Sequence, residues 1–240
     1  MRKTNIILVI ILVQIFSAQL CYAGFLDSVM KMFGGSSQVK SDENTIISAL
    51  KEAISIGANN AVNSVSKNDG YFGNQAIKIL MPEKIKMITD GLSKIGYQKQ
   101  VDDFILSMNR AAEKAAPEAT AFFINAIKEM TFEDARKILN GSDTAATDYF
   151  KIKTNDKLYE AFKPIISSSM NEAGVTRYYK DMTSKFTSLP FVKPELLDLD
   201  HYVTNNALDG LFYMIGEEEK KIRTDPKARV TELLKKVFEK

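Results

Sequence analysis

The sequence predicts an all-α fold, an irregular multi-helix bundle of about 8–10 helices. Along most of the chain after residue 40, apolar residues recur at steps of three and four, which is the spacing of one helix face. Alternating polar and apolar runs, typical of half-buried strands, are nearly absent. We therefore expect a single helical domain over residues 41–240, preceded by two shorter segments.

Residues 1–23 have the pattern of an export signal peptide. Two basic residues precede a short apolar run, and Cys21, Tyr22 and Ala23 place small residues before a cleavage site at Gly24. The apolar run is too short to span a bilayer, which needs about 20 apolar residues. We expect an exported, periplasmic protein. The alternative is anchoring through a lipidated Cys21, which the large Leu20 before it disfavours.

Removal of this signal changes the composition of the protein. The chain has 32 basic and 30 acidic side chains, and the signal holds Arg2, Lys3 and the one cysteine. The remaining protein carries no net charge and can form no disulfide. It also lacks the basic excess typical of nucleic-acid-binding proteins. We therefore expect no nucleic-acid partner.

Residues 24–40 are predicted to form an amphipathic segment followed by a flexible linker. Apolar residues have helical spacing from Phe25 to Phe33, and the stretch 34–37 (Gly-Gly-Ser-Ser) then interrupts the pattern. Two interpretations remain open. The segment Phe25–Phe33 is either a short helix docked on the domain or a peripheral contact to a membrane or a partner.

The domain is expected to begin with two helices. A long helix runs from Ser41 to the turn residues 68–70 (Asn-Asp-Gly). Pro82 is expected at the first position of the next helix. That helix carries apolar residues as far as Ile95 and ends at Gly96.

The longest periodic run extends from Gln98 to Met130. Pro117 removes a backbone hydrogen bond near its middle, so we expect a kink or break there. Alanines near its centre should let a neighbouring helix approach closely. Thr131 and Asp134 then resemble a capping box that opens a new helix, and residues 140–141 (Asn-Gly) close it.

The second half of the domain is predicted to be helical as well. Helices are expected at about 143–150, 156–170, 175–186 and 200–223, with a last helix opened by Asp225 and Pro226. Pro164 should bend the second of these helices.

Residues needed for several common chemistries are missing. Beyond the signal only one histidine, His201, remains, which excludes zinc sites with two or three histidines and all cysteine-based sites. The motifs of serine-hydrolase elbows, zinc proteases and phosphate-binding loops are also absent. We expect no metal and no cofactor.

The first candidate polar cluster consists of Asn109, Arg110 and Glu113 on an apolar helix. Arg110 and Glu113 are three residues apart and can pair. The structural interpretation is a surface ion pair or a buried strut between helices. The functional interpretation is an arginine poised for an acidic group of a ligand.

The second candidate cluster consists of His201, Asn205 and Asp209, at successive steps of four along one helix. An aspartate can orient a histidine for base catalysis, but His201 and Asp209 are about 12 Å apart along the helix axis. Asn205 would have to bridge them. The structural interpretation is a solvated or interhelical polar face.

A third cluster has three glutamates at 217–219 followed by basic residues. The spacing predicts two ion pairs that stabilise the helix, Glu217–Lys221 and Glu219–Arg223. A cation site on the acidic residues is the minor alternative.

Several stretches occur in the same order as in one bacterial family. They are Met108-Asn109-Arg110-Ala111-Ala112-Glu113, Ala145-Ala146-Thr147-Asp148-Tyr149-Phe150, Tyr202-Val203-Thr204, Ala207-Leu208-Asp209-Gly210-Leu211-Phe212 and Leu233-Leu234-Lys235-Lys236-Val237-Phe238. Over roughly residues 42–240 the chain resembles the domain-of-unknown-function 4197 family. The resemblance implies an exported protein of Gram-negative-type bacteria with one domain, and it implies no activity or catalytic residue.

Two hypotheses for function follow. The first is a non-enzymatic periplasmic module that binds a partner protein or an apolar small molecule. The second is a cofactor-free, hydrolase-like enzyme in which the clusters at Asn109, Arg110 and Glu113 and at His201 and Asp209 converge in one cleft. The second requires catalytic groups within hydrogen-bond reach of one another.

Overall fold

The computed structural model describes residues 41–174 and 198–228. Within these ranges every regular element is a helix, so the predicted all-α bundle is confirmed. The signal peptide, the segment 24–40, the helix predicted at 175–186 and all of the last helix beyond residue 228 lie outside the described residues.

The α-helices follow the chain with short 3₁₀ and π turns between some of them. They are α2 (Ser41–Val65), α3 (Glu83–Leu92), the π turn η1 (Ser93–Tyr97), α4 (Gln98–Ala115), the 3₁₀ turn η2 (Ala116–Glu118), α5 (Ala119–Glu129), α6 (Phe132–Leu139), α7 (Ala145–Glu172), α9 (Leu199–Thr224) and the 3₁₀ turn η3 (Pro226–Ala228).

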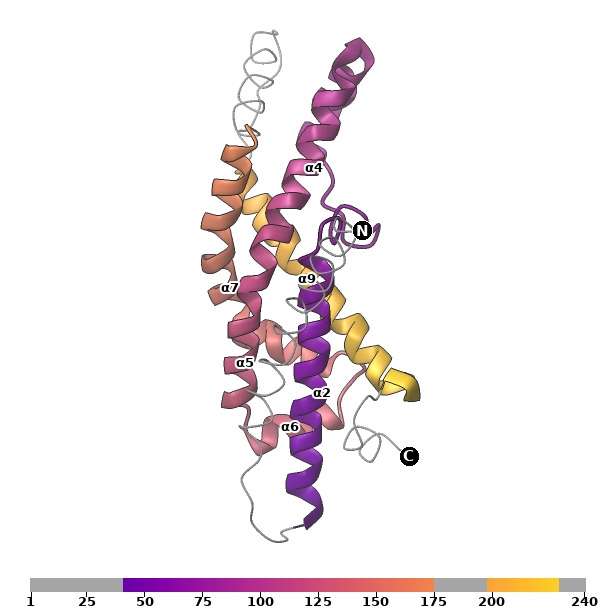
Figure 1. Cartoon of the computed structure of the whole chain (residues 1–240), viewed down its shortest axis with the longest axis vertical. Coiled ribbons are helices and arrows are strands. Elements are labelled where there is room, and N and C mark those ends of the chain that lie inside the picture. Colours follow the sequence, from indigo (N-terminus) through magenta and orange to yellow (C-terminus); the bar gives the residue numbers. More distant parts are fainter. Residues whose placement is uncertain (1–40, 175–197, 229–240) are drawn as a thin grey trace, which may run out of the picture.

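The described part is elongated, and its long helices run roughly along one axis (Figure 1). Helix α9 crosses the bundle and packs on α7 and α2, and α4 packs on α7. The start of α2 lies at one end of the molecule, whereas the first turns of α4 reach the opposite end (Figure 1). The hairpin of α3 and α4 therefore projects away from the end at which α2 begins.

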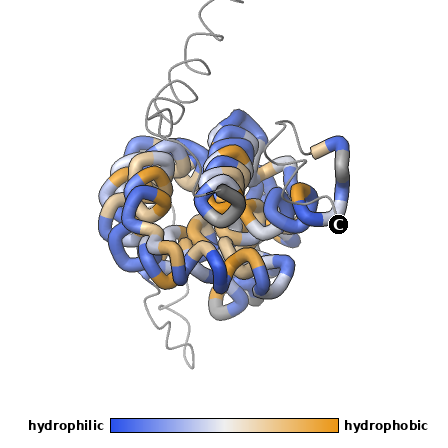
Figure 2. The backbone as a smooth tube through the Cα atoms, turned by 90° about the horizontal axis from the view of Figure 1, so that it is seen from below, coloured by the Kyte–Doolittle hydropathy of each residue, from blue (hydrophilic) through white to orange (hydrophobic). Residues whose placement is uncertain are grey.

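A continuous core lies between these helices. Seen end-on, hydrophobic positions gather where the helices face one another, and hydrophilic positions dominate the outside (Figure 2). The alanines Ala111, Ala115 and Ala119 are fully buried. Their burial places the small side chains of the α4–α5 run against neighbouring helices, where close approach was expected. The surrounding volume is filled by aromatic residues, among them Phe123 and Phe150, whose rings lie 4.8 Å apart.

Several local predictions are confirmed. The break expected at Pro117 is the 3₁₀ turn η2, which separates α4 from α5. At the start of α6 the Thr131 hydroxyl accepts a hydrogen bond from the Asp134 N–H, and the Asp134 carboxylate accepts one from the Thr131 N–H. These reciprocal bonds form the predicted capping box.

Three local predictions are wrong. The helices expected at 143–150 and 156–170 are one continuous helix, α7, because no helix breaker separates them and the buried face continues through Phe150, Thr154 and Leu158. Pro82 precedes α3 as its N-cap rather than occupying its first position. Helix α3 also ends before Ile95, which is 70% exposed because Gly96 turns the chain at a φ of 97°.

Candidate functional site

Asn109 lies in α4 and is fully buried. Its side-chain oxygen accepts a hydrogen bond from the Ile79 N–H at 2.8 Å, and its amide nitrogen donates to the carbonyls of Ile79 and Ile105, each at 2.8 Å. Ile79 belongs to the segment 66–82, which connects α2 to α3 without long helices. The Asn109 side chain therefore hydrogen-bonds to both backbone polar groups of Ile79, as the backbone of a neighbouring strand would in a β-sheet.

Arg110 and Glu113 hold an earlier part of the same segment. One Glu113 oxygen accepts hydrogen bonds from the N–H groups of Tyr71 and Phe72 at 3.0 and 3.2 Å, and the other accepts one from Arg110 at 2.6 Å. Arg110 also donates to Asp69 at 2.7 Å. Partial desolvation opposes the charged form of Arg110, but these hydrogen bonds outweigh it and raise its pKa.

The first cluster is thus brought together as a strut. It fixes the connecting segment on α4, and Glu113 is only 5% exposed. Tyr71, fully buried beside it, donates its hydroxyl to the Ala207 carbonyl of α9 at 2.6 Å. Burial first, and the Glu113 carboxylate second, raise the pKa of Tyr71, so its hydroxyl stays protonated and donates.

The second cluster lies on the exposed side of α9. The His201 Nδ1 and the Tyr159 hydroxyl of α7 are 2.7 Å apart, and the Asn205 side chain lies 3.0 Å from the His201 Nε2. Asp209 instead faces Lys151 of α7, with 3.7 Å between the charged atoms. Asn205 therefore contacts the histidine, but Asp209 has a different neighbour.

The first cluster lies on α4 and the second on α9. Tyr71 approaches α9 at the buried Ala207, whereas His201 and Asp209 are exposed. Among the described residues, no hydrogen bond or ion pair joins a member of the first cluster to a member of the second. The structure brings together the first cluster, and it brings Asn205 to His201, but it joins neither Asp209 to His201 nor the two clusters to each other.

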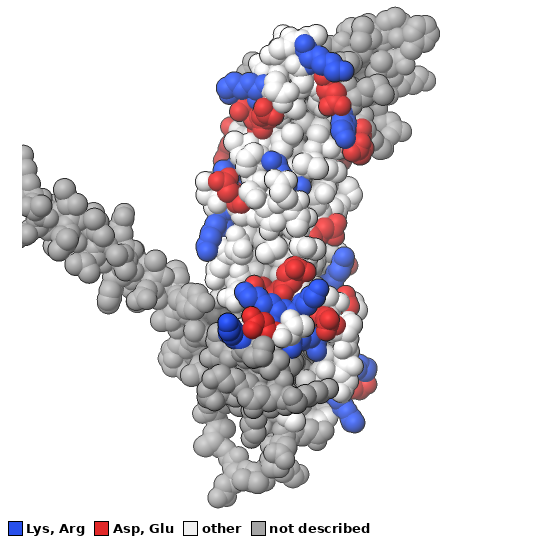
Figure 3. Space-filling view, turned by 90° about the vertical axis from the view of Figure 1, so that its right-hand side faces the viewer, with Lys and Arg blue, Asp and Glu red and all other residues white. Residues whose placement is uncertain are grey.

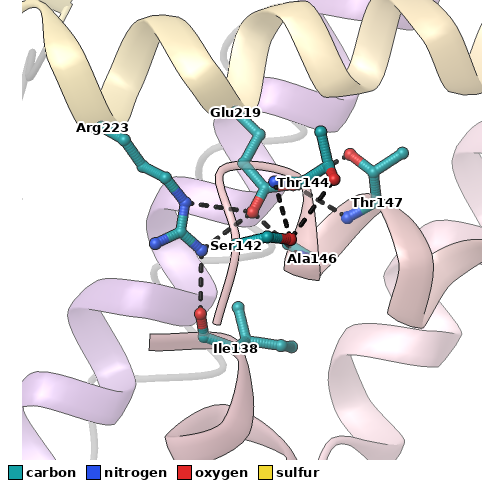
Figure 4. Close-up of polar contacts among 7 residues, drawn as sticks. All are labelled: Ile138, Ser142, Thr144, Ala146, Thr147, Glu219 and Arg223. Atoms are coloured by element: carbon teal, nitrogen blue, oxygen red, sulfur yellow. Dashed lines mark hydrogen bonds and ion pairs between the residues drawn. The ribbon is translucent and has the colours of Figure 1, made fainter. Parts of the chain in front are cut away.

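Glu219, in the third cluster, connects α9 to the start of α7 (Figure 4). Its two oxygens accept hydrogen bonds from the N–H groups of Ala146 and Thr147 and from the Thr147 hydroxyl, all at 2.9 Å. The first N–H groups of a helix have no partner within the helix, and Thr144 provides no side-chain cap. Glu219 supplies the missing cap from another helix.

Arg223 completes this junction. It donates to Glu219 at 2.9 Å, which confirms the predicted ion pair, and to the Ile138 carbonyl at the end of α6 at 2.9 Å (Figure 4). The other predicted pair is wrong, since Lys221 lies 3.6 Å from Glu218 rather than pairing with Glu217. The sequence indicated an ion pair within a helix, but it contained no signal for the contacts with α6 and α7.

A small apolar cavity adjoins this junction. It lies between α2, α7 and α9, with Leu50, Gly57, Phe150 and Ile215 among its lining residues, and has a volume of about 20 Å³. A single water needs at least about 10–15 Å³. The cavity therefore has room for about one water and not for a larger ligand.

A much larger cleft opens between α3 and α4. Its volume is about 490 Å³. The apolar residues that line it are Leu80, Met81, Val101 and Ile105, and the charged ones are Glu83, Lys86, Asp90, Lys94 and Asp102. We did not predict this cleft from the sequence, because it depends on how the kink at Gly96 places α3 relative to α4.

Neither a metal centre nor a membrane-spanning helix is found in the described ranges. No group of three or more His, Cys, Asp or Glu side chains there is arranged to hold a metal ion. None of the helices there combines the length and the apolar character needed to cross a bilayer.

Comparison with known proteins identifies the family. The model of the family described as "Protein of unknown function (DUF4197)" matches residues 40–239. The chain belongs to the DUF4197 family. A search of curated proteins and a search of solved structures each found no match to the chain.

The family match covers all the described helices of this DUF4197 chain, including both candidate clusters and the α3–α4 cleft. The family description names no activity, so it assigns no role to any of these residues. A function has to be argued from the geometry.

Proposed function

We propose that this DUF4197 protein is an exported, non-enzymatic helical module that binds a partner protein in the cleft between α3 and α4. The observation that carries the proposal is the cleft, which has a volume of about 490 Å³ and is lined by both apolar and charged side chains. Protein interfaces combine an apolar centre with a polar rim in the same way. Leu80, one of the apolar lining residues, is 59% exposed in the isolated chain.

The bonding of the polar clusters supports a role in structure over one in catalysis. A general acid or base must reach a proton of the substrate. Asn109, Glu113 and Glu219 are buried, and each is already hydrogen-bonded to backbone groups of another segment. Among the described residues, no carboxylate side chain hydrogen-bonds to the ring of His201.

The cavities favour a protein over an apolar small molecule as the partner. Pockets for drug-sized ligands have volumes of roughly 300–1,000 Å³ and are mostly apolar. The apolar cavity beside Glu219 is far smaller, at about 20 Å³. The α3–α4 cleft is large enough, but five charged side chains line it, and these suit the polar rim of a protein interface better than an apolar molecule.

The proposal of export rests on the amino-terminal sequence. Mass spectrometry of the protein from the cell that makes it tests this part. Cleavage after Ala23 predicts a chain that begins at Gly24 in the soluble periplasmic fraction. A lipidated Cys21 in the membrane fraction would support the anchored alternative, and an intact amino terminus in the cytoplasm would contradict export.

Site-specific photo-crosslinking tests the binding proposal. A photoreactive amino acid is placed at Leu80, inside the cleft, in the full chain expressed in its own cell. The matched control carries it at Ile152 of α7, which is apolar and 83% exposed but lies outside the cleft. We expect a discrete crosslinked protein product from position 80 only. The absence of any product at position 80, or the same product at position 152, would contradict the proposal.

A further inference from the structure

We infer that the occupant of the α3–α4 cleft is a second copy of the chain, with the α3 helices of the two copies side by side and antiparallel. This inference rests on the proposed function, because it names the partner that the cleft binds. It is carried by the order of charges along α3.

Four charged residues form a row on α3 and the turn that follows it. They are Glu83, Lys86, Asp90 and Lys94, and all four line the cleft. Their steps of three, four and four keep them on one side of the helix. Their signs alternate along the row, and side chains of both signs are visible at this end of the molecule (Figure 3).

This alternation makes the row complementary to its own reverse. When two copies lie antiparallel, Glu83 of each faces Lys94 of the other, and Lys86 of each faces Asp90 of the other. In a parallel, in-register arrangement each residue would face a like charge. The row therefore favours a two-fold symmetric pair, which is the commonest symmetry of protein dimers.

Within one copy the row is not strongly paired. Glu83 and Lys86 are 3.5 Å apart, with their side chains 85% and 54% exposed. Such exposed pairs contribute little stability in water. The same side chains can therefore exchange these contacts for contacts with a second copy.

The charges determine the orientation of the two copies, whereas burial of the apolar lining residues provides the driving force for association. Association has a large entropic cost that a few surface ion pairs do not offset. Covering the exposed Leu80 and the partly exposed Ile105 removes apolar surface from water. An antiparallel partner α3 seated against these residues makes a four-helix arrangement from two hairpins, a packing that buries such stripes in helical bundles.

Charge-swap variants test the inference. The protein is expressed from the full chain, purified in its processed form, and its dimer dissociation constant is measured by analytical ultracentrifugation. Lys86→Glu and Asp90→Lys each place like charges opposite one another at two symmetric positions. We expect each single variant to weaken the dimer at least tenfold. The double variant restores opposite charges, and we expect a dissociation constant within about threefold of the wild-type value.

The control is Lys137→Glu in α6. Lys137 is 72% exposed and pairs with Glu133 at 2.8 Å, so it resembles Lys86 but lies outside the cleft. It should leave the dimer unchanged, and circular dichroism checks that all variants remain helical. A wild-type protein that stays monomeric up to about 200 µM, single variants that dimerise normally, or a double variant no better than the single ones would each overturn the inference.

The crosslinking experiment separates this inference from the proposed function. A product at position 80 with twice the mass of the chain supports both. A product of any other mass supports the proposed function and overturns the second-copy inference. The absence of a product contradicts the proposed function.

Discussion

Three consecutive glutamates of α9 differ in burial and in their partners. Glu217 is exposed, and Glu218 is partly buried and accepts a hydrogen bond from Asn60 of α2. Glu219 is buried, caps α7 and pairs with Arg223. The helical phase of α9 makes this distinction, because a step of one residue rotates a side chain by about 100°.

Replacing Glu219 with alanine is therefore expected to destabilise the protein. The change leaves the N–H groups of Ala146 and Thr147 without their acceptor and Arg223 without its carboxylate. Removing one partner of a buried pair costs about 3–5 kcal/mol, and we expect about 3 kcal/mol in the free energy of unfolding measured with urea. Glu217→Ala, at an exposed position of the same helix, should change it by less than about 0.5 kcal/mol. Equal effects of the two substitutions would contradict the capping role.

Asp134 gives the capping box of α6 a dependence on pH. Hydrogen bonds from the Thr131 hydroxyl and then from the Thr131 N–H lower the pKa of Asp134. Because the folded pKa lies below the unfolded value of about 3.9, the stabilisation is complete above that value and is lost as the pH falls through the folded pKa.

We expect Asp134→Ala to cost about 1 kcal/mol at pH 7 and progressively less below pH 4. Urea unfolding of the wild-type and variant proteins at pH 7 and at pH 3 measures the two differences. Glu160→Ala, at an exposed site of α7, serves as the control and should show a small effect at both values. A cost for Asp134→Ala that is unchanged at the lower pH would show that the charge of Asp134 is unimportant.

At the scale of elements, the sequence predicted where helices begin and end and which of their faces are buried better than it predicted the contacts between helices. Periodicity located α2, the α4–α5 break and α9, since these depend on local spacing and on proline. The same rules divided α7 into two helices, because its continuity depends on buried side chains such as Leu158. The sequence offered a buried strut as one interpretation of the Asn109 cluster, but it had no signal for the segment that the strut holds or for the cap from Glu219, since these contacts join segments distant in sequence.

Two glycines within helices show how the effect of a glycine-to-alanine substitution on stability depends on contacts between segments distant in sequence. A Cβ on Gly210 of α9 would lie 2.7 Å from the Tyr71 ring and 3.1 Å from the Ile77 Cβ, whereas a Cβ on Gly91 of α3 would meet nothing within 4 Å. Helix propensity alone favours alanine at either position by about 1 kcal/mol.

We therefore expect opposite results from the two alanine variants. Gly91→Ala should raise the free energy of unfolding by about 0.5–1 kcal/mol. Gly210→Ala should lower it by about 1–3 kcal/mol, because Tyr71 is tied to Ala207 and overpacking has this cost. Chemical denaturation measures both. Stabilisation by Gly210→Ala would show that the connecting segment can move away from α9 without loss.

At the scale of the whole molecule, packing is uneven along the long axis. Helices α7 and α9 pack on each other and on the rest of the bundle, whereas α3 contacts mainly η1 and α4 beside the open cleft. Opening of part of a protein requires less free energy where few buried contacts are broken. The α3–η1 end is therefore expected to open before the body of the bundle does.

Hydrogen exchange followed by mass spectrometry tests this order and the association of two copies together. In dilute protein the amides of residues 83–97 should exchange faster than those of α7 and α9. In concentrated wild-type protein their exchange should slow, because a second copy covers the cleft, while the rates in α7 stay the same. The Lys86→Glu variant should show the dilute pattern at both concentrations. Protection of α3 equal to that of α7 in dilute protein would contradict the uneven stability, and slowing that persists in Lys86→Glu would contradict the role of the charge row.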